Sequence, residues 1–376
     1  MPSRPDSHCS PTAGLSLDRM AVTQLSATDA AVWRGLCELG PQTRSPYLGP
    51  DWPRRLAEVE GPDRDLGQVV VIRRGAEAVG FGSARVAGRV GLPMGAPFND
   101  YQALILAPGI EIAGPEMCRA LGIARLDFTA TPADLPGLSG AIRSREPAFE
   151  IDLRAGFAAY AVDRAEAGSQ IVRECASHRR GLDRAHGGVR FTPGSLDCRD
   201  LTQLIQWKRQ QCLATGQMDV LAPDWVGALI DRLVLAPDPH LRAMLFTLHV
   251  GGCLAAAHLA LATPRRLHAW IIGYDPSFSR YSPGNVLMME VVEWAASRGY
   301  EALDLGPGDV LFKRRFANRI TEVGSGFLAR PSLSGWSGQA AFAARHLAES
   351  LPLGPLSDLP ARAMRRWDRM RALASH

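Results

Sequence analysis

Short apolar runs alternate with amphipathic stretches along this chain, and the two patterns predict different elements. Apolar runs that end at Gly-containing turns are typical of strands, whereas apolar residues spaced by three and four are typical of helices. In the first part they predict helices over 30–39 and after a cap at Asp51, and strands over 69–72, 78–87 and 126–129. In the second part they predict helices over 169–184, 201–215, 225–235 and 285–298, a hairpin of 243–250 and 253–262, and strands over 267–274 and 302–305. Strands and helices that alternate without a repeat indicate a mixed α/β fold.

The length of 376 residues suits two domains. We expect a disordered N-terminus over 1–18, a first domain over 19–160, a second over 161–330, and a Pro- and Gly-rich linker with a helical tail over 331–376. Apolar residues are 46% of the chain and charged residues 21%, which excludes a disordered, collagen-like or coiled-coil chain.

Three features predict a cytoplasmic location. No basic start leads into an apolar stretch with a cleavage site. The longest nearly apolar stretch, Cys253–Ala262, is about half of a membrane span and contains His258. The seven cysteines form no C-x-x-C pair and are interpreted as reduced thiols.

The charge is concentrated at one place in the sequence. Among 42 basic residues only Lys208 and Lys313 are lysines. The formal net charge is +4, and five arginines against Asp368 within 361–376 account for all of it. The rest of the chain is neutral in sum, which argues against DNA as a partner.

A Tyr-Ser-Pro-Gly-Asn run precedes the helix predicted over 285–298. Ser282 is a suitable N-cap, and Pro283 fits the first helical position. Gly284 and Asn285 then carry amide hydrogens without helical acceptors, which together with the helix dipole form an anion site. A capped helix with no ligand is the other interpretation. Leu287, Val291, Trp294 and Ala295 form the predicted core stripe of this helix.

The order of strand, phosphate-ready loop, helix and strand over 267–308 resembles the acyl-CoA site of the GNAT acetyltransferases. Over roughly 40–330 the chain is more closely similar to the CelD/BcsL-like branch of that superfamily, which is related to the FemABX transferases. The matching motifs are Trp207-Lys-Arg, Val250-Gly-Gly, Tyr274-Asp-Pro, Tyr281-Ser-Pro-Gly, Leu303-Asp-Leu-Gly-Pro-Gly-Asp309 and Phe312-Lys313, with Ser45-Pro-Tyr and Phe98-Asn-Asp-Tyr101 upstream.

The resemblance implies two tandem GNAT-like folds, each a mixed, mostly antiparallel sheet flanked by helices. It implies an acyl donor in the second fold, acetyl-CoA or another acyl-CoA. No metal is expected, because none of the nine histidines pairs with another at helical ligand spacing. The usual Q/R-x-x-G-x-G/A loop of GNAT enzymes is missing, so the donor would be bound by the run that starts one residue earlier, namely Arg280, Tyr281, Ser282, Pro283, Gly284 and Asn285.

Acyl transfer to an amine needs a base for its proton and an acid for the leaving thiolate. The candidates lie on or after the strands that flank this loop: Asp304, Lys313, Asp309, Tyr274 and His268. Asp304 is the first choice for the base. Strand alternation predicts that His268, Trp270, Ile272 and Tyr274 share one face. Lys313 as a solvated charge and His268 as a core residue are the alternatives.

The first domain is expected to be catalytically silent and to help bind the acceptor through Asn99, Asp100 and Tyr101, with Lys208 from the second domain. A plain turn at 98–101 is the alternative interpretation.

The tail contains a stripe of Met364, Trp367, Met370 and Leu373, flanked by arginines. It predicts a basic amphipathic helix, for which three roles are considered. It packs on the body, contacts the surface of the inner membrane, or binds a nucleotide such as cyclic di-GMP through Arg362, Arg365, Arg366, Trp367 and Arg369.

These features predict an N-acyltransferase that moves an acyl group from CoA to an amine on a sugar, exopolysaccharide or envelope precursor. One alternative is a FemABX-like transferase that uses aminoacyl-tRNA, and another is a regulatory protein that retains the fold without the chemistry. No H-E-x-x-H, G-x-S-x-G or P-loop motif occurs in the sequence.

Overall fold

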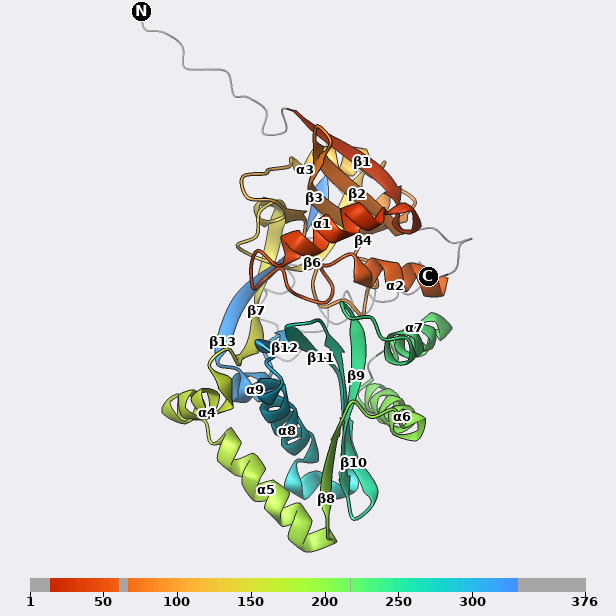
Figure 1. Cartoon of the computed structure of the whole chain (residues 1–376). Coiled ribbons are helices and arrows are strands. Elements are labelled where there is room, and N and C mark those ends of the chain that lie inside the picture. The colour runs from red at the N-terminus through yellow and green to blue at the C-terminus, as the bar shows by residue number, and fades with distance from the viewer. Residues whose placement is uncertain (1–13, 61–66, 217, 331–376) are drawn as a thin grey trace, which may run out of the picture. The chain divides into compact units, whose positions relative to one another are not determined.

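The computed structural model describes residues 14–60, 67–216 and 218–330, which form two compact units (Figure 1). Unit 1 contains the described residues up to 43, those of 67–145, and 324–330. Unit 2 contains 44–60 and the described residues of 146–323. The segment 44–60, which we expected in the first domain, belongs to unit 2 by its contacts. Each unit has a mixed sheet with helices, so the predicted α/β class is confirmed.

Unit 1 is built on strands in the order β1-β2-β3-β4-β6, with β5 beside β3 and the last residues of β13 after β6. The antiparallel pairs are β1 with β2, β2 with β3 and β3 with β4, whereas β4 and β6 are parallel. Its elements are β1 (Leu15–Ala21), η1 (Val22–Gln24), α1 (Ala27–Cys37), β2 (Gly67–Arg74), β3 (Glu77–Ala87), β4 (Val90–Leu92), β5 (Ile105–Leu106), α3 (Gly114–Ala120), β6 (Arg125–Pro132) and η3 (Ser139–Ala141).

The N-terminal expectation was wrong for residues 15–18. Leu15 to Asp18 belong to β1 and pair with Arg74 to Val71 of β2. Leu15 and Leu17 pack against the core of unit 1, and this apolar contact offsets the cost of ordering the strand. The pattern of two leucines was too short to be recognised as a strand.

Gly326 in β13 has no room for a side chain in unit 1. A Cβ there would lie 2.2 Å from the carbonyl oxygen of Ala141 and 2.9 Å from the Phe128 ring. We expect Gly326→Ala to lower the free energy of unfolding by about 3 kcal/mol, because a backbone atom must move. Gly140→Ala, which meets nothing within 4 Å, is the control and should change it by under about 0.5 kcal/mol. Urea titration of both variants measures the difference; equal stabilities would contradict the prediction.

Unit 2 has strands in the order β7-β12-β11-β10-β9-β8. All these neighbours are antiparallel except β11 and β12, which are parallel. Strands β7 and β13 contribute residues to both units. The elements are α2 (Asp51–Glu60), β7 (Ile142–Asp152), α4 (Gly156–Glu166), α5 (Ile171–His186), β8 (Val189–Pro193), α6 (Cys198–Ala214), α7 (Asp224–Leu235), β9 (Arg242–Val250), β10 (Cys253–Ala262), β11 (Arg266–Tyr274), η4 (Pro276–Tyr281), α8 (Pro283–Ser297), β12 (Ala302–Pro307), α9 (Leu311–Phe316) and β13 (Arg319–Ala329). The predicted helices and strands of this half are confirmed.

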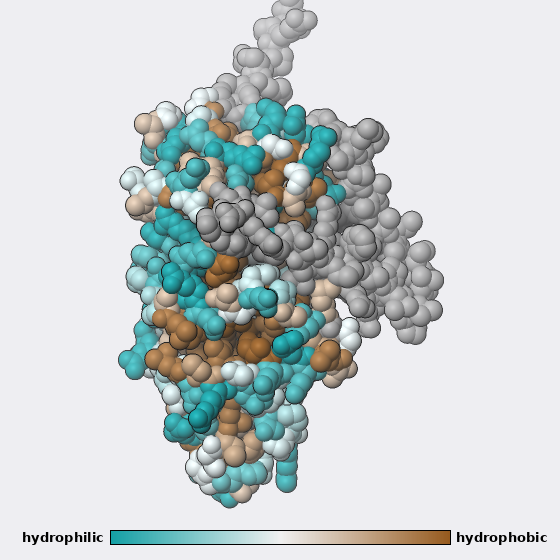
Figure 2. Space-filling view, turned by 90° about the vertical axis from the view of Figure 1, so that its right-hand side faces the viewer, coloured by the Kyte–Doolittle hydropathy of each residue, from teal (hydrophilic) through white to brown (hydrophobic). Residues whose placement is uncertain are grey.

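Helices cover both faces of the sheet of unit 2 (Figure 1). The α8 face carries α8 and α5, and its core includes Leu287, Val291 and Ala295 of the predicted stripe. The opposite face, called the α6 face, carries α6 and α7. Apolar side chains gather on the surface of unit 2 over these two helices (Figure 2), where Leu213 and Leu235 are exposed at the helix ends.

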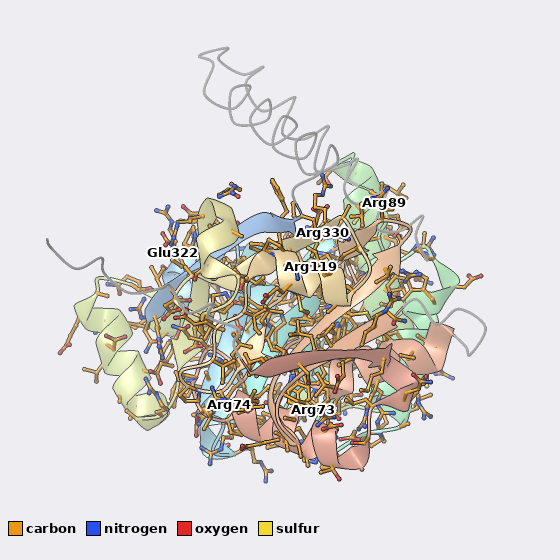
Figure 3. All side chains as sticks on the ribbon, turned by 90° about the horizontal axis from the view of Figure 1, so that it is seen from above. Arg73, Arg74, Arg89, Arg119, Glu322 and Arg330 are labelled. Atoms are coloured by element: carbon orange, nitrogen blue, oxygen red, sulfur yellow. The ribbon has the colours of Figure 1, made fainter. Side chains whose placement is uncertain are left out.

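Several arginines of unit 1 extend from its surface (Figure 3). Arg73 pairs with Asp18 and Asp29. The backbones of Arg89 and Arg330 both bond to that of Ala124. The Ala124 N–H donates to the Arg89 carbonyl at 2.8 Å, and the Arg330 N–H donates to the Ala124 carbonyl at 3.0 Å. Folding therefore brings together arginines that are far apart in the sequence.

The predicted tail helix, including Arg362, Arg365, Arg366, Trp367 and Arg369, lies outside the described residues. Within the described part of the chain, none of the helices has the length and apolar character that crossing a bilayer requires.

Candidate acyl-transfer site

The two parallel strands of unit 2 stay together for only three residue pairs. Arg266 to His268 of β11 align with Ala302 to Asp304 of β12, and the pairing then stops. Beyond this point β11 continues to pair with β10, and β12 with β7. Within the described residues, 269–273 of β11 therefore have no strand partner on the β12 side. An open strand edge in the middle of a sheet offers backbone N–H and C=O groups to an extended ligand.

A β-bulge lies where the strands part. The register between β10 and β11 shifts after Leu259, so that Ala269 and Ile271 have partners and Trp270 is the extra residue. A bulge inverts the alternation of side chains that follow it. The prediction that His268, Trp270, Ile272 and Tyr274 share one face was therefore wrong.

Contacts on both faces of β11 confirm the inversion. Ile272 packs in the core of the α8 face with Leu267, and Tyr274 lies against Gly284 of α8. His268 faces Tyr47, and a Cβ at Gly273 would meet Leu204 and Trp207 of α6. His268 and Tyr274 therefore lie on opposite faces of the sheet.

The loop before α8 adopts an unusual conformation at its last residue. Ser282 occupies the predicted N-cap position, but its φ of 47° and ψ of 57° are left-handed, and its side chain makes no cap hydrogen bond. Its carbonyl oxygen instead accepts the N–H groups of Asn285 and Val286, at 2.9 and 3.1 Å. The predicted side-chain cap was wrong. Non-glycine residues in this conformation cost about 1 kcal/mol, and such strain is common at ligand-binding turns.

The first turn of α8 leaves a donor available. The N–H of Gly284 has no acceptor among the residues that the structure describes, and a Cβ on Gly284 would touch only Tyr274, at 3.5 Å. With the Ser282 hydroxyl beside it and the positive end of a 15-residue helix behind it, this turn is suited to a phosphate group.

The neighbouring loop residues are bound to helix α5. Tyr281 packs against Gly181, whose Cβ would lie 2.8 Å from the tyrosine ring, and the guanidinium of Arg280 lies over that ring at 5.7 Å. The Cys175 thiol of α5 donates a hydrogen bond to the carbonyl oxygen of Asn285, with Sγ 3.4 Å from that oxygen. Tyr281 and Pro283 thus support the turn through packing, whereas Arg280 is exposed.

His268 and Asp304 meet at the point where β11 and β12 part. His268 Nδ1 lies 3.4 Å from Asp304 Oδ2, and both side chains are almost fully buried. Burial by itself raises the pKa of the Asp304 carboxyl. The His268 charge and hydrogen bond, the Arg266 charge and the Gly306 N–H outweigh this effect and lower the pKa to about 2. Asp304 is therefore ionised at neutral pH and orients the imidazole.

The other predicted catalytic residues lie at the carboxyl ends of the two strands. Tyr274, the last residue of β11, is 48% exposed. Lys313 of α9 donates from Nζ to the carbonyl of Pro307, the last residue of β12, at 2.6 Å. Asp309 is exposed and both of its oxygens bond to Arg314, which lowers the pKa of Asp309. Tyr274 and Lys313 therefore each place a polar group near the carboxyl ends of β11 and β12, whereas the Asp309 carboxylate is bound to Arg314.

Segment 44–60 covers His268 on the α6 face. The ring of Tyr47 meets that of His268 at 5.0 Å, and Trp52 meets Trp270 at 6.2 Å, both edge to face. Sequence reasoning singled out Ser45-Pro-Tyr and Asp51-Trp-Pro but placed them in the first domain. Only the contacts show that they belong to the second unit. Asp51 is the first residue of α2 rather than its cap.

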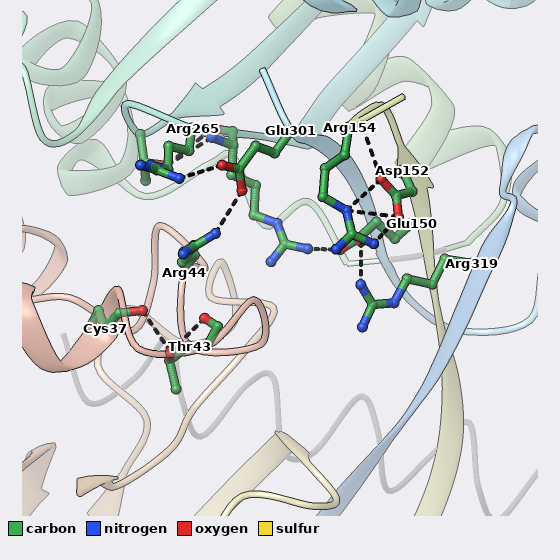
Figure 4. Close-up of polar contacts among 12 residues, drawn as sticks. Cys37, Thr43, Arg44, Glu150, Asp152, Arg154, Arg265, Glu301 and Arg319 are labelled. Atoms are coloured by element: carbon green, nitrogen blue, oxygen red, sulfur yellow. Dashed lines mark hydrogen bonds and ion pairs between the residues drawn. The ribbon is translucent and has the colours of Figure 1, made fainter. Parts of the chain in front are cut away.

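An arginine–carboxylate network lies at the opposite ends of β11 and β12. Glu150 of β7 contacts Arg266 and Arg319. Glu301 lies between Arg44 and Arg265 (Figure 4). Arg44 therefore attaches segment 44–60 to the residue before β12.

The predicted acceptor residues are largely occupied within their own segments. Asn99 and Tyr101 are buried, and the Asn99 side-chain amide donates to the Tyr101 carbonyl at 3.4 Å. Lys208 Nζ donates to Gln211 of the same helix at 3.1 Å. Acceptor binding by Asn99, Asp100, Tyr101 and Lys208 stays a prediction. Among the residues described, no group of three or more His, Cys, Asp or Glu side chains could hold a metal.

Comparison with known proteins identifies the class of domain. Residues 169–314 match the family model for the acetyltransferase (GNAT) domain. The structure is similar to that of FemX, with a TM-score of 0.51 and 10% identity over 83% of this chain and 97% of that one. It is also similar to a tandem GNAT protein from the clavulanic acid biosynthesis pathway, with a TM-score of 0.47 and 12% identity over 85% and 99% of the two chains. No curated protein sequence matches the chain. Residues 169–314, which lie in unit 2, thus match a GNAT acetyltransferase domain, and the predicted GNAT-type fold is confirmed.

Proposed function

We propose that this protein is an N-acyltransferase that moves an acetyl or related acyl group from acyl-CoA to an amine on a sugar, exopolysaccharide or envelope precursor. The observation that carries the proposal is the early separation of β11 from β12 next to the free first turn of α8. Together they offer one extended ligand a strand edge for amides and a helix terminus for phosphates.

The donor would bind with its pyrophosphate at Ser282 and Gly284 and its pantetheine amides along residues 269–273 of β11. The thioester would then lie near the bulge at Trp270, where β11 and β12 are no longer paired. Acetyl-CoA is the donor that the GNAT domain favours.

The base and the acid would be groups at the two ends of the open edge of β11, residues 269–273. The amine nitrogen attacks the thioester carbon, the C–S bond breaks, and the amine proton passes to His268, which Asp304 holds in place. Tyr274 or Lys313 would give a proton to the leaving thiolate. Asp304 was our first choice for the base, but a carboxylate with a pKa of about 2 accepts protons poorly.

The proposed acceptor rests on the resemblance to the CelD/BcsL-like branch, which motifs such as Tyr274-Asp-Pro and Leu303-Asp-Leu-Gly-Pro-Gly carry. A FemABX-like transfer from aminoacyl-tRNA is the second candidate, and the fold likeness to FemX favours it. Its donor would call for a broad basic surface, whereas residues 1–360 are neutral in sum.

A thiol-release assay with acetyl-CoA and a panel of amine-bearing activated sugars tests the function. Release that depends on the amine supports the proposal. Transfer only from aminoacyl-tRNA would replace it with the second candidate. No transfer and no heat on titration with acetyl-CoA would favour a regulatory protein that has lost the chemistry.

Gly284→Glu is expected to weaken acetyl-CoA binding by ~100-fold, because like charges placed together cost several kcal/mol. Isothermal titration calorimetry measures the change. Gly227→Glu is the matched control, since Gly227 also lies in a helix of unit 2 and has open space around its Cβ. Unchanged affinity in a Gly284→Glu variant that folds normally by circular dichroism would remove the phosphate site from α8.

A further inference from the structure

The ring of Tyr47 closes over the imidazole of His268 from a segment distant in the sequence. The two ring centroids are 5.0 Å apart and the planes are at 82°. Trp52 packs edge to face against the Tyr47 ring, with centroids 4.9 Å apart and an interplanar angle of 84°. Tyr47 is 5% exposed, Trp52 1% and His268 0%, so these rings have no solvent to move into.

Segment 44–60 is attached to unit 2 at both ends of this aromatic contact. Arg44 bonds to Glu301 at 2.7 Å, and Glu58 bonds to Arg232 of α7 at 2.7 Å. Arg55 reaches the carbonyl of Ala236 at 3.3 Å. These bonds fix the backbone on either side of Tyr47 and Trp52, and therefore fix the ring that contacts His268.

An imidazole can present either of two edges, because its χ2 rotation has two broad minima. In one orientation Nδ1 faces Asp304, and in the other a carbon does. Only the first brings Nδ1 to 3.4 Å from Asp304 Oδ2, a contact with a carboxylate that favours the tautomer with the proton on Nδ1. Because the Tyr47 ring packs edge to face against this fully buried imidazole, we expect it to restrict the rotation that exchanges the two orientations.

We propose that Tyr47 is a positioning residue, which holds His268 with Nδ1 toward Asp304 and so completes the acid–base pair of unit 2. The effect on rate rests on the proposed acyl transfer, whereas the orientation of the ring does not. A segment that lies in the sequence between α1 and β2 of unit 1 thus orients a residue of the second unit.

Nitrogen-15 NMR of histidine-labelled protein tests the orientation directly, with the His268 signal assigned from its loss in His268→Gln. The unsubstituted protein and Tyr47→Phe, which keeps the ring, should show one tautomer with the proton on Nδ1. Tyr47→Leu should show a mixture. Phe191→Leu is the control, because Phe191 is another aromatic ring of unit 2 but packs on the α8 face, stacked on Phe246 with centroids 6.3 Å apart.

The kinetic consequence is measured separately. Tyr47→Leu should lower kcat ~10-fold with the acetyl-CoA dissociation constant unchanged, and Tyr47→Phe should restore kcat. A single unchanged tautomer in Tyr47→Leu would overturn the proposal. If the unsubstituted protein transfers no acyl group, the proposed function fails, and the NMR result still decides whether Tyr47 orients His268.

Discussion

Replacing Asp304 by Asn is expected to lower kcat for acyl transfer by ~10²- to 10⁴-fold, the range that a positioned base contributes. Asn has the shape of Asp but no charge to orient or stabilise the His268 imidazole. The acetyl-CoA dissociation constant should not change, because Asp304 is buried where the strands are still paired and the donor would bind beyond that point. Single-turnover kinetics and calorimetry measure the two quantities.

A double substitution separates a role through His268 from a direct role. If Asp304 acts only by orienting His268, adding Asp304→Asn to His268→Gln should cause no further loss of kcat. If the two losses multiply, Asp304 acts on the substrate independently and the paired mechanism is wrong.

The acid limb of stability provides a check on the ionisation of Asp304. Its pKa is lower in the folded chain, about 2, than the ordinary value of 3.8. The ionised carboxylate therefore stabilises the fold above pH 3.8, and the contribution, on the order of 2 kcal/mol, is lost as pH falls toward 2. Asp304→Asn should flatten this limb in urea titrations between pH 4 and pH 2.

The elements that sequence predicted well are those with long periodic patterns. Helix α8 buries Leu287, Val291 and Ala295 as its spacing indicated, and the hairpin of β9 and β10 follows two apolar runs around Gly251-Gly252. In both cases the local pattern agrees with the burial that tertiary contacts impose, so periodicity alone identifies the element.

The incorrect predictions share one physical origin, namely contacts between residues that are distant in the sequence. The bulge at Trp270 depends on the register against β10, which no alternation rule contains. Because it inverts the faces that follow, His268 is separated from Tyr274 and meets Tyr47 instead. Likewise, Ser282 is both the last cap of η4 and the first cap of α8, and it joins the two helices in a left-handed conformation. Sequence preference alone favours a serine whose side chain caps the helix.

Substitution of the largely buried carboxylate Glu150 is the other change with a large expected effect. It contacts Arg266 and Arg319, with side-chain exposures of 12% for Glu150 and 8% for Arg266. We expect Glu150→Gln to lower the free energy of unfolding by about 3–5 kcal/mol, because it removes one charge from a buried pair and leaves the guanidinium of Arg266 in a low-dielectric site. Urea titration, with hydrogen exchange at β7 and β11 amides, locates the loss in unit 2.

Glu58 is a matched control for this substitution. It also contacts two arginines of unit 2, Arg55 at 2.9 Å and Arg232 at 2.7 Å, but its side chain is 40% exposed. Glu58→Gln should therefore cost under about 1 kcal/mol, since water screens the pair and solvates the arginines when it is broken. Residue type and partner number are the same in the two cases, so the difference measures burial. Equal losses would mean that Glu150 acts as a surface ion pair and that the amino-terminal ends of β11 and β12 are held by packing alone.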